Sequence, residues 1–340
     1  MDNIFDYTIV ELQDSLKSKS FPHFLAKQVF GWVYKKRIGD FDLMTNISKE
    51  VRKYLKDNFS FLQLKLAKKD TSCDGTEKFL FELEDSSIIE TVFIPEGKRN
   101  TLCVSTQVGC KFKCKFCVSG QSGFRRNLSA AEIINQYLAV SDLVAPAKIT
   151  NIVFMGIGEP LDNLDNTIRA ISILTAKAGI NFSKKKICIS SCGLVPEIKK
   201  LAELDLDVKL SISLHSADDD IRSMLMPVNK KYPLRDLMAA LKLFYQAKKQ
   251  AITFEYVLLG NINTKREDAL KLVKLLHGIK AKVNLIPYNG ANPEFKPPLT
   301  EEIDNFRDEL KRRGILTTLR KSRGQDIKAA CGQLKAAFEK

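Results

Sequence analysis

The sequence predicts an α/β fold in which repeated strand and helix units form a parallel sheet or barrel, preceded by a smaller α+β domain. Three observations support this prediction. The chain has 340 residues and is 44% hydrophobic, which is enough to bury a large core. From Thr101 onwards, short apolar or β-branched runs alternate with helical segments. Before Thr101, three helical patterns are followed by stretches with a two-residue period.

The N-terminal helices are predicted from their start signals. Thr8 and Glu11 form a capping-box pattern. Pro22 lies where a second helix begins, and Ser48 can cap a third, with Val51, Leu55 and Phe59 on one face. Alternating stretches at 62–66, 78–83 and 88–92 then predict a strand pair or meander. We therefore expect a small N-terminal domain over residues 1–95.

The core is predicted because strand patterns alternate with helical patterns along the chain. Strands are expected at 151–155, 186–190, 208–213, 252–258, 281–286 and 315–319, and helices near 129–140, 166–176, 234–245, 266–276 and 301–311. Such folds place their chemistry at the carboxyl ends of the strands, and the motifs described below lie there. We place this core at 96–324 and a C-terminal segment at 325–340.

The distribution of charge indicates a polyanion as partner. The net charge is +14, and residues 1–100 hold 16 basic and 16 acidic side chains, whereas the remainder holds 38 and 24. An excess confined to one part of the chain is typical of a nucleic-acid-binding surface. Basic clusters lie at 111–115 with Arg125 and Arg126, and at 184–186, 230–231 and 311–313. The alternative is a basic protein whose lysines are simply solvated.

Nothing in the sequence indicates secretion or membrane insertion. The first ten residues lack the cationic region of a signal peptide, and no apolar run approaches the ~20 residues of a membrane helix. We therefore expect a cytoplasmic protein with reduced thiols and no membrane partner.

Three closely spaced cysteines form the most informative motif. Cys110, Cys114 and Cys117 follow the spacing Cys-x3-Cys-x2-Cys, on a segment too short for regular structure between them. Three thiolates can bind a metal or cluster and leave one coordination position open. A structural zinc ion requires four protein ligands, whereas an iron-sulfur cluster held by three cysteines leaves one iron free.

Three other interpretations of this motif are disulfides, a zinc site and buried apolar cysteines. Disulfides would need an oxidising compartment. A zinc ion could recruit Cys103 as a fourth ligand, although the six-residue gap is unlike paired zinc knuckles. Buried apolar cysteines are disfavoured because lysines alternate through the motif at 111, 113 and 115.

The segment 156–160 follows a predicted strand and contains two glycines. It lacks the third glycine of a dinucleotide-binding fingerprint, and Pro160 removes an amide donor where a phosphate-binding helix would begin. Two glycines nevertheless allow a ligand to approach the backbone.

Together these motifs resemble those of radical S-adenosylmethionine (SAM) enzymes, because Cys110, Cys114 and Cys117 are followed by Ser119-Gly120. The flanks 101–109 and 123–128 are similar to those of adenine methyltransferases that modify 23S ribosomal RNA. The similarity continues through 154–160, 213–215, 284–289 and 330–334, so that it covers nearly the whole chain. The resemblance implies a partial (β/α)6 radical SAM barrel.

The resemblance also implies the cofactors and the residues that bind them. A 4Fe-4S cluster would be held by Cys110, Cys114 and Cys117, and two SAM molecules would be used per turnover. The residues expected around SAM are Gly158, Glu159, Ser190, Ser213, Leu214, His215 and Asn289. Since Ser190 and Ser191 are adjacent, the choice between them stays open.

Three catalytic roles follow from the resemblance. Cys331 would carry the methyl group as S-methylcysteine, and Cys103 would form a transient disulfide with Cys331 to release the RNA. Glu90 would be the proton acceptor, whereas its sequence context alone indicates a solvated strand residue. A radical route is needed because an aromatic carbon such as adenine C2 has no nucleophilic lone pair.

The function implied by the resemblance is methylation of adenine C2 in 23S rRNA and in tRNA, by a monomer that receives electrons from flavodoxin or ferredoxin. The alternative within the family is the C8 methyltransferase that confers antibiotic resistance. A radical SAM enzyme with a small-molecule or protein substrate would leave the basic second part and Cys331 unexplained. A metal-stapled RNA-binding module would not need the SAM-facing loops.

Overall fold

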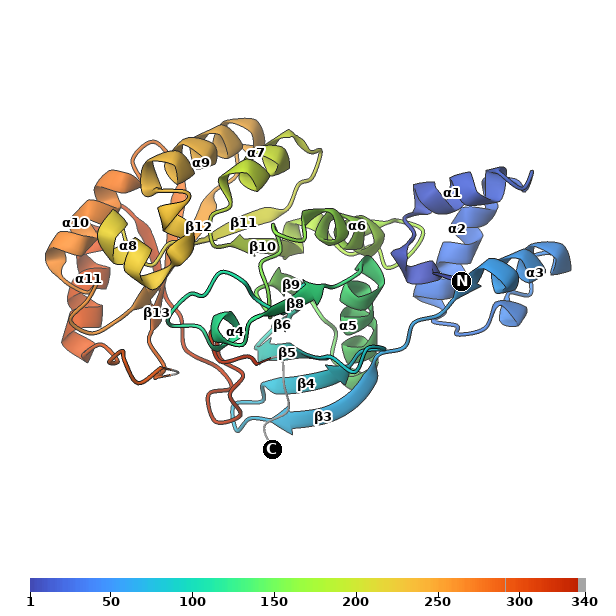
Figure 1. Ribbon diagram of the computed structural model, residues 1–340, viewed down its shortest axis with the longest axis horizontal. Helices are drawn as coiled ribbons and strands as arrows, with labels where there is room; N and C mark the ends of the chain where they lie inside the picture. Colours follow the sequence, from blue (N-terminus) through green and yellow to red (C-terminus); the bar gives the residue numbers. More distant parts are fainter. Residues whose placement is uncertain (291, 336–340) are drawn as a thin grey trace.

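The computed structural model describes residues 1–290 and 292–335. Its central element is a ten-stranded sheet in the order β14-β13-β12-β11-β10-β9-β6-β5-β4-β3 (Figure 1). The strands are β3 (Lys65–Thr71), β4 (Glu77–Glu82), β5 (Ile88–Glu96), β6 (Arg99–Cys103), β9 (Asn151–Phe154), β10 (Ile187–Ser191), β11 (Lys209–Ser213), β12 (Ile252–Leu258), β13 (Ala281–Pro287) and β14 (Leu316–Leu319). Strand β6 and strands β9 to β14 are parallel, and β3 to β6 pair antiparallel. The predicted α/β class and partial barrel are confirmed.

The parallel strands form the core because both of their faces are covered. Ile152, Ile189, Ile212, Phe254 and Val283 are each completely buried, one from each central strand. Such continuous apolar runs are typical of parallel sheets flanked by helices. This burial explains why the strands could be predicted from short apolar runs.

Helices connect the parallel strands. They are α5 (Ala130–Leu143), α6 (Leu164–Thr175), α7 (Val195–Glu203), α8 (Asp219–Leu225), α9 (Leu234–Lys248), α10 (Arg266–Leu275) and α11 (Thr300–Arg312). Ser129 caps α5 and forms a capping box with Glu132. The sequence prediction did not include α7 or α8. Short 3-10 turns lie at Ile4–Asp6, Phe41–Leu43, Lys184–Lys186 and Pro227–Lys230.

The N-terminal helices gather at one end of the molecule, opposite α8 to α11 (Figure 1). They are α1 (Ile9–Lys17), capped by Thr8 and Glu11 as predicted, α2 (Leu25–Phe30), which continues as a π-helical turn over Gly31–Lys35, and α3 (Lys49–Asn58), capped by Ser48. Phe59 does not belong to the apolar face of α3, because it lies in β2 (Phe59–Ser60), which pairs with β1 (Asp2–Asn3).

The N-terminal helices are joined to the core by polar contacts with α5. Asp6 accepts a hydrogen bond from the Ala131 backbone N–H at 2.7 Å. Arg37 donates to Asp142 at 2.8 Å. Strands β3 to β5, which we placed with these helices, extend the core sheet, because β5 pairs with β6, β4 with β5 and β3 with β4. The predicted boundary near residue 95 therefore cuts across one continuous sheet, and it stays a prediction.

The C-terminal segment returns across the cysteine motif after β14. The Val118 backbone N–H donates to the Gly332 carbonyl at 2.8 Å, and Ser119 Oγ donates to the Leu334 carbonyl at 2.7 Å. Residues 336–340 of the predicted segment lie outside the described residues. In the described part of the chain, no helix is long and apolar enough to cross a membrane.

Candidate active site

A cavity of about 160 Å³ lies where the parallel strands end. Its lining comes from the loop after β9, from the ends of β10 and β11, and from β12 and β13. The lining residues with thiol, hydroxyl, imidazole or charged side chains are Cys110, Cys114, Cys117, Glu159, Ser190, Ser191, Cys192, Ser213, His215, Glu255, Arg320 and Cys331. The predicted position at the carboxyl ends of the strands is therefore where the structure brings these residues together. We call this space the cluster cavity.

The three motif cysteines lie on an irregular loop between β7 (Gln107–Gly109) and the short helix α4 (Val118–Gln121). β7 pairs with β8 (Phe124–Asn127), so the loop is closed at its base. Gly109 is required there, because a Cβ atom at this position would lie 1.9 Å from the Gly123 carbonyl oxygen. The hairpin thus fixes the direction in which the loop enters the cavity.

The three thiols are desolvated and can supply three sulfur ligands to a cluster. Burial raises the pKa of Cys110 to about 12, and it also raises the pKa values of Cys114 and Cys117. Without a neighbouring cation the thiols are therefore protonated at neutral pH, and the positive charge of bound iron would stabilise them as thiolates. Within the described ranges, no three Cys, His, Asp or Glu side chains are placed to hold one metal ion. Three thiols are one ligand fewer than the closed tetrahedral site of a structural zinc ion requires.

Gly158 and Glu159 form one wall of the cluster cavity. Gly158 has a φ of 103°, and a Cβ atom there would lie 2.5 Å from Gln107 Cβ, so only glycine fits. Glu159 is 4% exposed and accepts backbone hydrogen bonds from Leu161 at 3.0 Å and from Cys192 at 2.7 Å. Burial raises its pKa to about 7. A buried carboxyl group held in this way can bind an ammonium group.

Some of the other residues expected around SAM line the cluster cavity, and others do not. Ser190, Ser213 and His215 line the cluster cavity. Ser191 lines it too, but its hydroxyl accepts a hydrogen bond from the Gly193 backbone N–H at 3.0 Å. The side chain of Leu214 is completely buried in the core. The choice between the two serines stays a prediction.

Asn289 is not part of the cavity lining. Its side-chain amide donates to the Cys331 carbonyl at 3.1 Å. The residue therefore holds the backbone of the C-terminal segment. No sequence signal indicated this contact, because the two residues lie on separate segments.

His215 is neutral in the folded protein. It is 3% exposed, its Nδ1 accepts a hydrogen bond from the Val257 backbone N–H at 3.0 Å, and its ring contacts Phe116 edge-on at 4.6 Å. Burial lowers its pKa to about 3. The histidine therefore cannot act as a cationic acid at neutral pH.

This burial predicts a loss of stability in acid. Between pH 6.5 and about 3 the unfolded chain binds a proton on His215 that the folded chain does not, so the free energy of unfolding falls as the pH falls. At pH 5 the expected cost is about 2 kcal/mol relative to pH 7. Urea unfolding of the wild type and of His215→Gln at both pH values would measure it. Equal pH dependence of the two proteins would contradict the prediction.

Glu255 is a cavity residue that the sequence prediction missed. It lies within the apolar strand β12 and is 5% exposed. One carboxylate oxygen accepts hydrogen bonds from Ser211 at 2.8 Å and Asn284 at 3.0 Å, whereas the other has no hydrogen-bond partner in the described structure. A single acidic residue inside an otherwise apolar predicted strand is the signal that could have identified it.

A second, smaller cavity of about 20 Å³ brings Cys103 and Cys331 together. Cys103, at the end of β6, is buried, and Cys331 is exposed and lines the cluster cavity as well. Arg320 lines both cavities, and the nearby Cys331 sulfur raises the pKa of its guanidinium. All eight cysteines, which lie in the described ranges, are free thiols. Cys331 thus links the two spaces.

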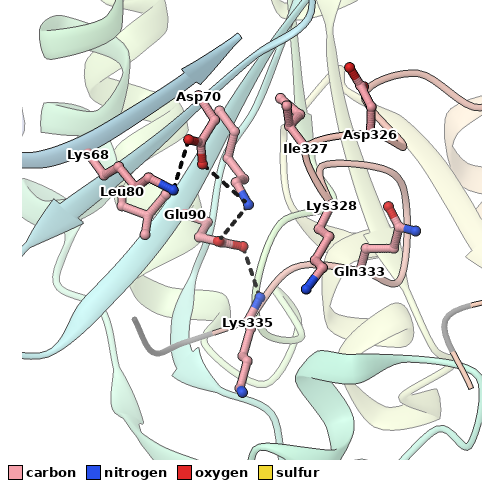
Figure 2. A pocket seen from close by; sticks show the side chains of 10 residues that line it. Lys68, Asp70, Leu80, Glu90, Asp326, Ile327, Lys328, Gln333 and Lys335 are labelled. Atoms are coloured by element: carbon pink, nitrogen blue, oxygen red, sulfur yellow. Dashed lines mark hydrogen bonds and ion pairs between the residues drawn. The ribbon is translucent and has the colours of Figure 1, made fainter. Parts of the chain in front are cut away.

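Glu90 lines neither of the two cavities that contain Cys331. It lines a third cavity of about 260 Å³ between β3 to β5 and the C-terminal segment (Figure 2). The residue is 3% exposed, so it is not the solvated strand residue that its sequence context indicated. One carboxylate oxygen accepts a hydrogen bond from the Lys335 backbone N–H at 2.8 Å.

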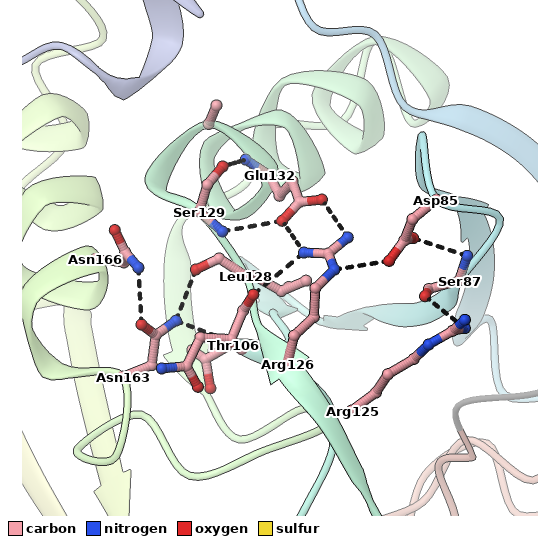
Figure 3. Close-up of polar contacts among 12 residues, drawn as sticks. Asp85, Ser87, Thr106, Arg125, Arg126, Leu128, Ser129, Glu132, Asn163 and Asn166 are labelled. Carbon is pink, nitrogen blue, oxygen red and sulfur yellow. Dashed lines mark hydrogen bonds and ion pairs between the residues drawn. The ribbon is translucent and has the colours of Figure 1, made fainter.

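The basic cluster around the cysteine motif is largely used within the protein. Arg126 forms ion pairs with Asp85 and Glu132, both at 2.8 Å (Figure 3). Arg125 donates to Ser87 Oγ at 3.0 Å, and the Lys111 amine lies 2.6 Å from Asp162. Arg126 thereby joins the β7–β8 hairpin to α5 and to the turn between β4 and β5. The expectation that these side chains contact RNA stays a prediction. Exposed clusters remain at 184–186, 230–231 and 311–313.

Comparisons with known proteins agree with this geometry. The profile of the radical SAM superfamily matches residues 104–276, and the N-terminal domain of the ribosomal RNA large subunit methyltransferases matches residues 2–60. The dual-specificity RNA methyltransferase RlmN of Campylobacter fetus subsp. fetus is 45% identical over 98% of both chains. The probable dual-specificity RNA methyltransferase RlmN of Spiroplasma citri is 45% identical, covering 100% of this chain and 99% of its own. A crystal structure of a radical SAM methyltransferase from Sphaerobacter thermophilus superimposes with a TM-score of 0.92 at 41% identity, covering 99% and 100% of the two chains.

Proposed function

The chain belongs to the RlmN family of dual-specificity RNA methyltransferases within the radical SAM superfamily, and from this premise we propose that it methylates C2 of an adenine in 23S rRNA and in tRNA. It is an RNA methyltransferase that uses a 4Fe-4S cluster and SAM. The specific carbon, the pair of RNA substrates and the residue roles are the proposed part.

Three cysteines and the cavity wall would hold the cofactors. Cys110, Cys114 and Cys117 supply three sulfur ligands, and Glu159 supplies a buried carboxyl group for the ammonium of SAM. When bound, the cluster and SAM supply the methyl group and the radical chemistry that an aromatic carbon requires. Gly158 allows the backbone of this wall to pack against Gln107, because a Cβ atom at its position would lie 2.5 Å from Gln107 Cβ. Ser190, Ser213 and His215 line the rest of this wall. Asn289 would orient Cys331 through its hydrogen bond to the Cys331 carbonyl.

Three residues of the chain would each carry out one step of the methyl transfer. Cys331 sulfur carries the carbon that becomes the methyl group, and Glu90 accepts the proton that the adenine ring must lose. The Cys103 thiolate then attacks the Cys331 sulfur: the disulfide forms, the bond between the Cys331 sulfur and the methylene carbon breaks, and this carbon takes the electron pair and a proton to become the methyl group of the released RNA. An external reductant, such as flavodoxin or ferredoxin, supplies the electrons.

The observation that carries this proposal is the position of Cys331. It lines the cluster cavity, where a methyl group would be received, and also the small cavity that contains Cys103. A thiol used only in packing would not need access to both. The match of residues 2–60 to the N-terminal domain of ribosomal RNA methyltransferases supports an RNA-binding role for the predicted accessory domain.

Mass spectrometry of nucleosides tests the proposal directly. Anaerobically reconstituted protein is incubated with an rRNA fragment or a tRNA, a reductant and methyl-labelled SAM. We expect labelled 2-methyladenosine from both RNAs. 8-Methyladenosine would assign the chain to the C8 reaction, and SAM cleavage without any methyladenosine would overturn the proposed substrate.

A further inference from the structure

Glu90 shares one face of the sheet with a buried lysine on the neighbouring strand. In the antiparallel pair of β4 and β5, Leu80 lies opposite Glu90, and Lys78 lies opposite Val92. Residues two positions apart on a strand point to the same face, so Lys78 and Glu90 are diagonal neighbours. Diagonal neighbours are within reach of a long side chain. The register therefore brings the ammonium of Lys78 to the carboxylate of Glu90.

The two groups form part of a chain of alternating charges (Figure 2). Lys78 Nζ lies 3.4 Å from one oxygen of Glu90 and 3.9 Å from an oxygen of Asp70. The other oxygen of Asp70 lies 2.9 Å from Lys68 Nζ. On the far side, the Lys335 backbone N–H donates to the second oxygen of Glu90 at 2.8 Å. Each carboxylate oxygen of Glu90 thus has a fixed partner.

Because both groups are buried, the desolvation of their charges offsets much of the stability that this ion pair gives to the fold. The side chain of Lys78 is 9% exposed and that of Glu90 is 4% exposed. Removing two charges from water costs several kcal/mol per ion, and well-packed apolar residues often stabilise such a site equally well. The pair also borders a cavity of about 260 Å³ rather than a filled core. A carboxylate kept at the edge of a cavity in this way indicates chemical use.

We propose that Lys78 is a positioning residue for the methyl transfer, which keeps Glu90 ionised and directed into this cavity so that it can accept a proton. The inference rests on the proposed role of Glu90. Asp70 has a supporting part, because it holds the Lys78 ammonium from the side opposite Glu90.

The surrounding charges explain why Lys78 is needed. Burial raises the pKa of Glu90, and Lys78 is the strongest influence that lowers it. The charged side chains lining the cavity around Glu90 are Lys68, Asp70 and Lys78 from β3 and β4, and Asp326, Lys328 and Lys335 from the C-terminal segment. Asp70 raises the pKa of Glu90, and Lys335 lowers it through its backbone N–H rather than its ammonium. An opposite charge at this distance typically lowers the pKa of a carboxyl group by about one to three units.

The first test measures the titration of Glu90 in the full-length holoenzyme, without RNA. Glutamate carboxyl groups are labelled with carbon-13, and the NMR signal absent from Glu90→Gln identifies Glu90. In Lys78→Met, which keeps the length of the side chain but not its charge, the titration midpoint should rise by about one to three pH units. Lys78→Arg should leave it near the wild-type value. An unchanged midpoint in Lys78→Met would overturn the inference.

The second test uses the pH dependence of single-turnover methylation. The rate falls on the acid side as Glu90 becomes protonated, so this limb should move to higher pH in Lys78→Met and return with Lys78→Arg. A merely structural lysine would lower the rate without moving the limb, and that result would also overturn the inference. Lys78→Gln provides the same comparison where the methionine variant does not fold. Full activity of Glu90→Gln would instead refute the proposed role of Glu90, so the two failures are distinguishable.

Discussion

Replacing Cys331 with alanine is expected to abolish RNA methylation, with a loss of at least about 10³-fold in rate, while the cluster and SAM still bind. The reason is that the Cys331 sulfur is the proposed carrier of the methyl carbon, and no other thiol lines both cysteine cavities. The residue is exposed, so the substitution leaves no buried void. Methylated adenosine, iron and sulfide content, and SAM affinity would be measured on the same preparation.

Cys73→Ser is the matched control for this variant. Cys73 is also exposed, and it lies in a turn next to β4, outside the cluster cavity. It should retain wild-type activity. Normal methylation by Cys331→Ala would contradict the proposed mechanism. Loss of the cluster in Cys331→Ala would show instead that this residue supports the metal site.

The predicted site residues that the structure brings into one cavity were predicted from local spacing. Cys110, Cys114 and Cys117 are so close in the chain that their convergence needs no knowledge of the fold. The position of Gly158 and Glu159 was predictable because a buried strand immediately precedes them, and parallel strands end at a common edge. Local patterns were therefore enough to place the three cysteines and the segment with Gly158 and Glu159 at this edge of the sheet.

Other features depend on contacts between distant segments. The sequence placed Arg126 in a basic cluster expected to bind RNA. It could not predict that Arg126 pairs with Asp85 and Glu132, which lie 41 and 6 residues away. Helices α7 and α8 have only nine and seven residues, which is too short for a clear helical period. The burial of Glu90 depends on Lys335 returning over β5 from 245 residues away. No pattern within a single segment contains such information.

Replacing Cys103 with alanine is expected to trap the RNA on the protein instead of preventing its capture. Cys331 would still form the bond to the adenine, but no thiol would attack its sulfur to release the product. The covalent complex should accumulate to roughly one RNA per protein, because a step after the bond-forming one is blocked. Denaturing gels of a reaction with labelled RNA would show it as a slowly migrating band. The double variant with Cys331→Ala should show no such band.

The pH dependence of release in the wild type gives an independent test of the same step. Burial raises the pKa of Cys103 to about 12, so its thiol is protonated at neutral pH, and Arg320 is the nearby cation that opposes this rise. Only the thiolate attacks sulfur, and its fraction grows about tenfold per pH unit below the pKa. Release of the covalently bound RNA by the wild type should therefore accelerate as the pH rises, as long as this attack limits the rate. Cys188→Ala, which removes a half-buried strand thiol whose pKa desolvation also raises to about 12, should release RNA like the wild type. Equal trapping by Cys188→Ala and Cys103→Ala would mean that the effect comes from packing in the sheet and not from the attacking sulfur.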